Sequence, residues 1–435
     1  MFNGAPREGM EVVLEGGRIA SIGESRGEVN LPNRLVMPGF VNAHSHAFQR
    51  GIRGWVQHAV GEDNFWSWRD RMYGLANSLD PDGIEAVSRL AFLEMVEAGF
   101  TSVGEFHYLH HQPDGTPWDD PNELSKRVIS AARDVGLRIN LLRVAYARAG
   151  AGKGPAPGQR RFCDPSAAAV LKHVDDLISS DAVTGDDAVT VGLAPHSVRA
   201  VPSSWLSEFA SFDGVIHAHV DEQGEEIDQC LGEYGLRPIE VFSYAGLLNP
   251  RFTAVHLTWP DNRELQLLRR SGAGVCGCPT TELDLGDGFL QVEYLDGVNL
   301  SIGSDSHARI DPFAEMRALE WHARARLGRR NVMVASEDPS ALAARLAEIG
   351  SLGGARALGL DTGELRVGAM ADLIAIDLDH TALATGPVLP NVIFSGGPEL
   401  VREAWVGGRQ LLEGGRHPGR REIIEAANRA LQAAR

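Results

Sequence analysis

Residues 38–46 read Pro-Gly-Phe-Val-Asn-Ala-His-Ser-His, directly after the apolar run Leu-Val-Met at 35–37. In an extended strand, side chains two positions apart point to the same side, so His44 and His46 aim at one point while Ser45 faces away. Imidazole is the commonest metal-ligating side chain, and two on one face supply half of a zinc site. A His-x-His pair also occurs as two exposed loop histidines, so the interpretation depends on what the rest of the chain brings to this point.

The composition describes a large acidic chain. It has 435 residues, 43% of them hydrophobic, which is ample for a barrel-sized domain and something smaller. The formal net charge of −17 argues against nucleic acid and anionic membranes as partners. It also means that an anionic small-molecule substrate needs arginines placed locally.

Cysteine usage and hydropathy predict a cytoplasmic protein. The four cysteines show no CxxC or zinc-finger spacing, so we expect reduced thiols. We find no signal peptide and no apolar run of about 18 residues, so we expect no membrane span.

Between the two ends of the chain, apolar strands alternate with helical patterns. Residues 84–98 and 124–135 carry apolar side chains at steps of three and four, and each pattern stops at a glycine. An open doubly wound sheet would want a glycine-rich phosphate turn after its first strand, where this chain has His-Ser-His. We therefore predict an α/β fold, a (β/α)₈ TIM-like barrel. The predicted strands are 35–46, 102–107, 138–144, 189–196, 215–219, 253–256, 274–278 and 299–305.

Short strands around glycine pairs also occur at both ends of the chain, at 16–17 and 407–408. We predict that residues 1–37 and 362–415 form one small β-sandwich domain. Residues 38–361 would form the metal-dependent barrel, and residues 416–435 a C-terminal helix.

Most predicted barrel strands end in a polar or ionisable residue, and in this fold the carboxyl ends of the strands form the active-site face. His44 and His46 end the first strand, His219 the fifth, His256 the sixth and Asp305 the eighth. Each one alone is better explained as a core histidine bonded to backbone or a helix-capping aspartate. Together they form an N/O ligand set suited to Zn²⁺, with Fe²⁺ or Mn²⁺ as alternatives.

The pattern resembles the amidohydrolase superfamily, over nearly the whole chain. The resemblance rests on residues 38–46, His219, His256 and the Gly-Ser-Asp segment 303–305. It implies a metal site of His44, His46, His219 and Asp305 at the mouth of the barrel.

The resemblance also implies a single metal ion and a deaminase. Binuclear members need a carboxylated lysine or a glutamate after strand three or four, and none of the three lysines, at 126, 153 and 172, ends a predicted strand. Mononuclear members with a glutamate three residues after the strand-five histidine are typically deaminases, and Glu222 has this position after His219.

A narrower resemblance, to superfamily members that deaminate N-formimino-L-glutamate, rests on five blocks taken together. It implies that water converts this dicarboxylate to N-formyl-L-glutamate and ammonia, a step of histidine degradation. Trp259 departs from the pattern, because a second polar residue is expected there. The blocks are residues 44–50, 65–69, 105–111, 196–199 and 303–307.

The predicted site can be interpreted as the active site of a hydrolytic deaminase. Glu222 would take a proton from water activated by the metal and pass it to the departing nitrogen, while Asp305 orients that water. His256 would hydrogen-bond the attacking oxygen. Glu222 is also explained as a first-turn carboxylate that stabilises a helix N-terminus, since Asp221, Glu225 and Glu226 are acidic as well.

A dianionic substrate needs guanidinium groups, which match carboxylates with two parallel hydrogen bonds. Arg69 and Arg199 are the candidates, with Trp66, Trp68 and Tyr73 near Arg69, although arginines are common in surface ion pairs. We expect a homodimer. Further predicted substrate contacts are Gln49, Tyr108 and His196.

Two alternatives stay open. A mononuclear deaminase of a purine, pyrimidine or triazine ring would use the same metal residues, with aromatic stacking in place of two arginines. A non-catalytic scaffold with this fold would bind less than one equivalent of metal and lose no stability on chelation.

Overall fold

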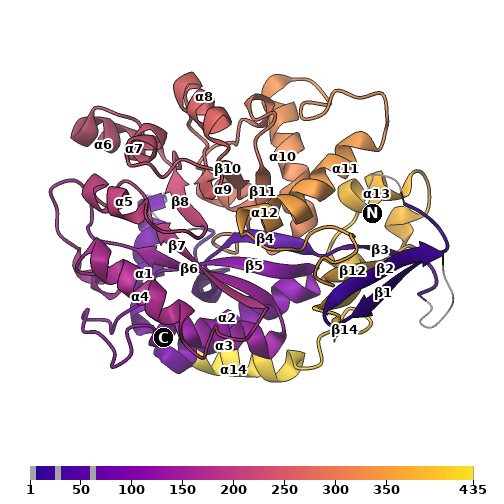
Figure 1. Cartoon of the computed structure of the whole chain (residues 1–435), viewed down its shortest axis with the longest axis horizontal. Coiled ribbons are helices and arrows are strands. Elements are labelled where there is room, and N and C mark those ends of the chain that lie inside the picture. Colours follow the sequence, from indigo (N-terminus) through magenta and orange to yellow (C-terminus); the bar gives the residue numbers. More distant parts are fainter. Residues whose placement is uncertain (1–5, 25–30, 59–64, 435) are drawn as a thin grey trace.

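The computed structural model describes residues 6–24, 31–58 and 65–434, without the side chains of Phe65 and Trp66. Its centre is a closed barrel of eight parallel strands, in which each strand lies beside its neighbours in the chain (Figure 1). The predicted (β/α)₈ barrel is therefore confirmed. Its strands are β4 (Phe40–Ser45), β5 (Phe100–His107), β6 (Arg138–Ala145), β7 (Val189–Pro195), β8 (Ile216–Val220), β9 (Phe252–His256), β10 (Gly274–Gly277) and β11 (Leu300–Ile302).

Helices connect the barrel strands and cover the outside of the barrel. The chain begins α2 with Asp80, whose side chain accepts the N–H of Gly83, and with a proline at the first helical position. It ends α3 at Gly136, whose φ of 87° is the left-handed conformation that glycine adopts without strain. The α-helices are α1 (Phe65–Ser78), α2 (Pro81–Glu97), α3 (Glu123–Val135), α4 (Ala167–Ile178), α5 (Ser203–Phe209), α6 (Gly224–Tyr234), α7 (Pro238–Tyr244), α8 (Asn262–Ser271), α9 (Pro279–Leu285), α10 (Pro312–Leu327), α11 (Ala341–Glu348), α12 (Gly354–Ala357), α13 (Val388–Ser395) and α14 (Arg420–Ala433).

Short segments of other helix types complete the connections. Most are 3₁₀ turns, and one is a π-helical turn between α11 and α12. They are η1 (Ala47–Ile52), η2 (Pro157–Phe162), η3 (Val292–Tyr294), η4 (Ile349–Gly353, the π turn), η5 (Thr381–Leu383) and η6 (Pro398–Leu400).

The first predicted strand, 35–46, is two strands in the structure. Its first half, β3 (Arg34–Pro38), pairs antiparallel with β12 (Leu373–Asp377) outside the barrel, and only β4 enters the barrel. The break lies at Gly39, where a Cβ atom would lie 2.1 Å from the hydroxyl of Thr101. Only glycine allows this approach, so the chain passes there from one sheet to the other.

Strands from both ends of the chain form the small sheets beside the barrel, as predicted. The four-stranded sheet has the order β14-β13-β12-β3, and the hairpin of β1 and β2 packs on it through Ile19, Ala371 and Leu373. Both lie on one side of the barrel, to the right in Figure 1. The domain limits themselves stay a prediction. The remaining strands are β1 (Met10–Glu15), β2 (Arg18–Glu24), β13 (Val401–Val406) and β14 (Arg409–Leu412).

The small sheet is tied to the amino ends of the barrel strands. Arg138 opens β6, and its buried guanidinium donates two hydrogen bonds, of 2.7 and 3.0 Å, to Asp372 beside β12. The carboxyl ends of the strands are thereby left free for the site. α14 packs against α2, below the barrel in Figure 1. Among the described helices, none combines the length and the apolar character needed to cross a bilayer.

Candidate metal centre and active site

The ionisable residues at the strand ends converge on one point. The Nε2 atoms of His44 and His46 lie 3.3 and 3.2 Å from Oδ1 of Asp305. Nε2 of His219 lies 3.1 Å from Nε2 of His44. Four of these residues, His44, His219, His256 and Asp305, offer ligand-type atoms that all lie within 4.8 Å of one another. His46 is not one of these four residues, but it contacts Asp305, which is.

The spacing and the protonation of these side chains fit a divalent cation. Nitrogen and oxygen ligands about 2.0–2.2 Å from a tetrahedral Zn²⁺ lie roughly 3.3–3.5 Å apart, close to the separations found here. Nδ1 of His219 lies 3.0 Å from the carbonyl of His196, and Nδ1 of His46 lies 2.9 Å from that of Phe106. These carbonyls accept the Nδ1 protons, which leaves an Nε2 lone pair free on each ring.

Burial sets the charge of the cluster. It lowers the pKa of His44 to about 3 and the pKa of His219 well below its ordinary value, so both rings are neutral. Burial alone would raise the pKa of Asp305, but contacts with His44 and His46 hold that pKa well below the usual range. An ionised carboxylate among neutral imidazoles is the donor set that zinc prefers.

His256 has a carboxylate on each side. Its Nδ1 lies 3.4 Å from Glu282, and its buried Nε2, which has no hydrogen-bond partner among the described residues, lies 3.7 Å from Glu222. Burial works against protonation, yet these acids raise the pKa of His256 well above its ordinary value. Glu282 also accepts the backbone N–H of Cys278, whose thiol pKa burial raises well above the usual range. We infer that His256 acts as a hydrogen-bond donor.

Glu222 faces the cluster instead of capping a helix. It follows β8 and precedes Gln223, the residue that caps α6, whose first-turn acids are Glu225 and Glu226. Its Oε2 accepts a 3.0 Å hydrogen bond from Nη2 of Arg199. The helix-terminus explanation therefore does not apply to Glu222.

The backbone is strained at two of these positions. His256 has a φ of 74° and Asp305 a φ of 44°, in the left-handed region that side-chain-bearing residues seldom adopt. Such strain persists only where the surroundings impose it, and it gathers at functional sites.

A cavity of about 370 Å³ opens on the cluster. Every predicted substrate contact lines it: Gln49, Arg69, Tyr108, His196 and Arg199. His46, His219, Glu222 and Asp305 line the same cavity.

The substrate-contact residues come from separate elements. Gln49, on η1, donates a 2.8 Å hydrogen bond to the hydroxyl of Tyr108, which follows β5. Arg69, on α1, lies over the ring of Tyr73 at 5.5 Å. Arg199 follows β7. The side chain of Trp66, predicted near Arg69, lies outside the described residues.

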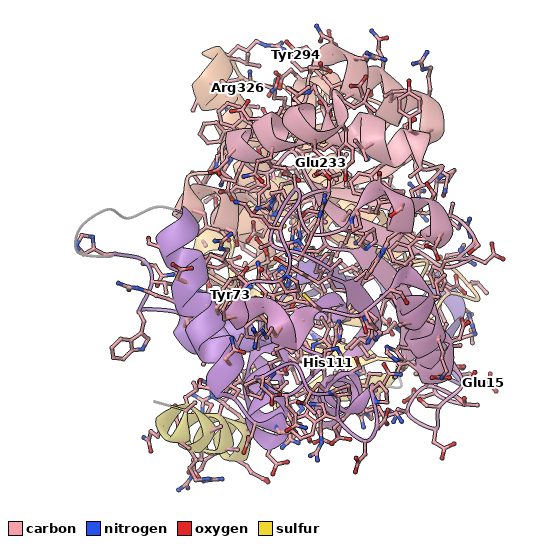
Figure 2. The ribbon with its side chains drawn as sticks, turned by 90° about the vertical axis from the view of Figure 1, so that its left-hand side faces the viewer. Glu15, Tyr73, His111, Glu233, Tyr294 and Arg326 are labelled. Carbon is pink, nitrogen blue, oxygen red and sulfur yellow. The ribbon has the colours of Figure 1, made fainter. Side chains whose placement is uncertain are left out.

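Several cavity residues were not predicted from the sequence as substrate contacts. The hydroxyls of Tyr73 and Tyr146 each accept a 3.0 Å hydrogen bond from Gln159, and Figure 2 labels Tyr73 on α1. Arg148 and Lys153 line the same cavity from the loop after β6. The sequence feature that could have indicated Arg148 and Lys153 is the long basic loop that follows β6 on the active-site face. Trp259, the departure from the family pattern, donates its indole N–H to the carbonyl of Asp287 and is half exposed.

The comparison with known proteins agrees with this geometry. Residues 35–411 match the model of the amidohydrolase family. The chain belongs to the amidohydrolase family. A formimidoylglutamate deiminase from Pseudomonas aeruginosa is 38% identical to this amidohydrolase over 401 residues, which cover 90% of this chain and 87% of the relative. A 5-methylthioadenosine/S-adenosylhomocysteine deaminase from Natronomonas pharaonis is 29% identical, over 92% of this chain and 87% of the relative.

The architecture of the amidohydrolase recurs in a solved structure. The crystal structure of an amidohydrolase from Brucella melitensis superposes with a TM-score of 0.90 at 35% identity, and the match covers 98% of this chain and 96% of the other. The likeness extends over the small sheets as well as the barrel, since it spans nearly the whole of both chains.

Proposed function

We propose that this amidohydrolase is a metal-dependent deaminase that converts N-formimino-L-glutamate and water to N-formyl-L-glutamate and ammonia. The observation that carries the proposal is the placement of two guanidinium groups, Arg69 and Arg199, in one cavity with Glu222 and the histidine cluster. The 38% identity to a formimidoylglutamate deiminase supports the same substrate.

We propose that His44, His46, His219 and Asp305 hold one divalent cation, Zn²⁺ by the preference of this donor set, with Fe²⁺ or Mn²⁺ as alternatives. Such an ion, when bound, lowers the pKa of water to roughly 7. No lysine ends a barrel strand in the described structure, which supports a single ion.

The protons are moved by Glu222. Its carboxylate, 3.7 Å from Nε2 of His256, takes a proton from the attacking water and delivers it to the amidine nitrogen that leaves as ammonia. His256 donates a hydrogen bond to the oxygen that becomes the formyl oxygen, and Glu282 holds the ring in place from its Nδ1 side. Asp305 orients the water.

The rest of the cavity fits a dicarboxylate. The chain carries a net charge of −17, so a dianion is held only where cations are concentrated. Arg69 and Arg199 would each take one carboxylate through a two-pronged contact. Gln49, Tyr108 and His196 supply further polar contacts to the substrate.

The test is ammonia release by the zinc-loaded protein from N-formimino-L-glutamate, set beside adenosine, cytosine, guanine and a triazine. The proposal predicts turnover of the formimino acid alone. Turnover of a ring substrate in its place would favour the runner-up, a purine, pyrimidine or triazine deaminase. Absence of all turnover, with less than one equivalent of metal bound, would favour a binding scaffold.

Two further predictions concern the setting of the enzyme. We expect a homodimer, which light scattering of the purified protein tests directly. We also expect a cytoplasmic location, which cell fractionation tests.

A further inference from the structure

Arg199 is held between two carboxylates of the segment that contains the proposed general base. Its Nη2 donates to Oε2 of Glu222 at 3.0 Å, and its Nε lies 3.9 Å from Oε1 of Glu226. Glu226 is fully buried, and its Oε2 accepts the backbone N–H of Glu222 at 3.1 Å. One arginine and one buried glutamate therefore fix both the main chain and the side chain of Glu222.

The same guanidinium lines the substrate cavity and is 11% exposed. A substrate carboxylate that binds it in two-pronged fashion needs two N–H groups on one edge of the fork. Nη2 and Nε form one edge of the fork, and that edge faces Glu222 and Glu226. A substrate carboxylate that takes this edge competes with Glu222 for Arg199.

We propose that Arg199 is a carboxylate-operated latch on Glu222: the substrate carboxylate takes over the guanidinium and frees Glu222 to accept a proton from water. The inference rests on the proposed function and deepens it, because it makes a carboxylate on the substrate a requirement for turnover and not only for binding. Glu226 keeps Arg199 in place while its partner changes.

The latch predicts selectivity against small amidines that carry no carboxylate. Formamidine carries the reacting group alone, and its hydrolysis, HN=CH–NH₂ + H₂O → O=CH–NH₂ + NH₃, needs the same proton transfer through Glu222. With no carboxylate in the cavity, Glu222 stays paired to Arg199, and formamidine turns over slowly. Interactions with a non-reacting part of a substrate are known to be used in this way to assemble a catalytic site.

The experiment divides the substrate into two pieces. Formamidine hydrolysis by the zinc-loaded wild-type protein is measured as ammonia release at increasing concentrations of glutarate, which supplies the two carboxylates without the amidine. The latch predicts a saturable rise in kcat/KM for formamidine of about tenfold or more, the coupling expected between two linked sites. No change, or inhibition by glutarate, would overturn it.

Two variants decide whether the response passes through Arg199. In Arg199→Gln, glutarate should no longer accelerate formamidine hydrolysis. A retained response would contradict the latch. The control variant Arg148→Gln removes a different cavity cation, one that is paired with Glu233, and should still respond to glutarate. Loss of the response in Arg148→Gln would contradict the latch, because glutarate would then act through the positive charge of the cavity in general.

Failure of the latch and failure of the proposed function are distinguishable in the same preparation. Turnover of N-formimino-L-glutamate without acceleration by glutarate refutes the latch alone. No turnover of N-formimino-L-glutamate refutes the proposed function, and the latch with it.

Discussion

The hydroxyl of Ser45 donates a 2.6 Å hydrogen bond to Oε2 of Glu105, behind the imidazoles of the two histidines that flank it. The other oxygen of Glu105 accepts the backbone N–H of Ala47 at 2.7 Å. One buried carboxylate on β5 therefore holds the end of β4 on both sides of His46. Such partners of metal ligands fix the direction in which the ligands point.

A second set of contacts ties β4 to the segment after β11 that carries Asp305. The side-chain amide of Asn42 donates to the hydroxyl of Ser304 at 2.7 Å and accepts its backbone N–H at 3.0 Å. The same hydroxyl lies 3.0 Å from Nδ1 of His307. Ser304 directly precedes Asp305, so the proposed ligands from both strands are aligned by one buried polar network.

Replacement of Glu105 by Gln should lower the affinity for Zn²⁺. The amide NH₂ cannot accept, so either Ser45 or Ala47 loses its acceptor and the histidine pair loses alignment. Comparable changes around metal ligands reduce affinity about 10–100-fold. Competition with a chromogenic chelator measures the effect. Glu97→Gln, at the last residue of α2, is the matched control, and equal zinc affinity in the two variants would contradict the prediction.

Glu105 should also make the metal-free protein less stable as the pH rises. Burial raises its pKa from 4.5 to about 7, so the unfolded chain loses this proton more readily than the folded one. The contribution is complete below pH 4.5 and is lost as the pH rises through 7, with a total of about 3 kcal/mol. Urea unfolding of metal-free protein at pH 5 and pH 8 should show a smaller decrease in Glu105→Gln than in the wild type. Parallel pH profiles would show that Glu105 is ionised without cost.

Glu222→Gln should abolish turnover and leave the metal bound. The amide retains an oxygen that can accept from Arg199 but cannot take a proton from water. A loss in kcat of about 10²–10⁴-fold is expected for the removal of a general base. Metal content by elemental analysis, beside ammonia release, separates the roles: loss of the ion together with activity would make Glu222 a ligand.

Arg199→Lys should weaken substrate binding although the charge is kept. An ammonium is a point donor and cannot reproduce the planar fork that grips a carboxylate. We expect KM for N-formimino-L-glutamate to rise about tenfold or more, the equivalent of one lost charge-assisted hydrogen bond. Steady-state kinetics measures this, and an unchanged KM would remove Arg199 from the substrate contacts.

Removal of the metal should destabilise the fold. Burial keeps the pKa of His44 near 3, so its imidazole stays neutral and ready to bind a cation at physiological pH. At a free Zn²⁺ concentration one hundred times the dissociation constant, binding stabilises the folded state by about 2.7 kcal/mol. Urea unfolding with and without a chelator should differ by that amount. Superimposable curves would support the scaffold interpretation.

Much of this site could be predicted from local sequence, because strand geometry places its residues. His44 and His46 share a face by the two-residue repeat of a strand, and His219, His256 and Asp305 each mark a strand end. In a barrel, all carboxyl ends meet at one rim, so strand order alone brings these side chains together.

The parts that were missed depend on tertiary packing. The sequence does not distinguish Glu105 from other strand residues, because its role depends on β4 lying beside β5. Glu282 reaches His256 from α9, which follows a different strand. The break at Gly39 comes from a contact with Thr101, 62 residues along the chain. Arg148 and Lys153 lie in a loop without a helical or strand repeat, so the sequence does not predict where the loop runs.

The most direct test of the proposed deamination follows the formimino carbon of the substrate, which water attacks. Zinc-loaded protein is mixed with N-formimino-L-glutamate labelled with ¹³C at the formimino carbon, and the products are observed by NMR while ammonia is counted. The account predicts one ammonia for each N-formyl-L-glutamate, with the label in the formyl group. Labelled formamide with free glutamate, or an unchanged substrate, would contradict it.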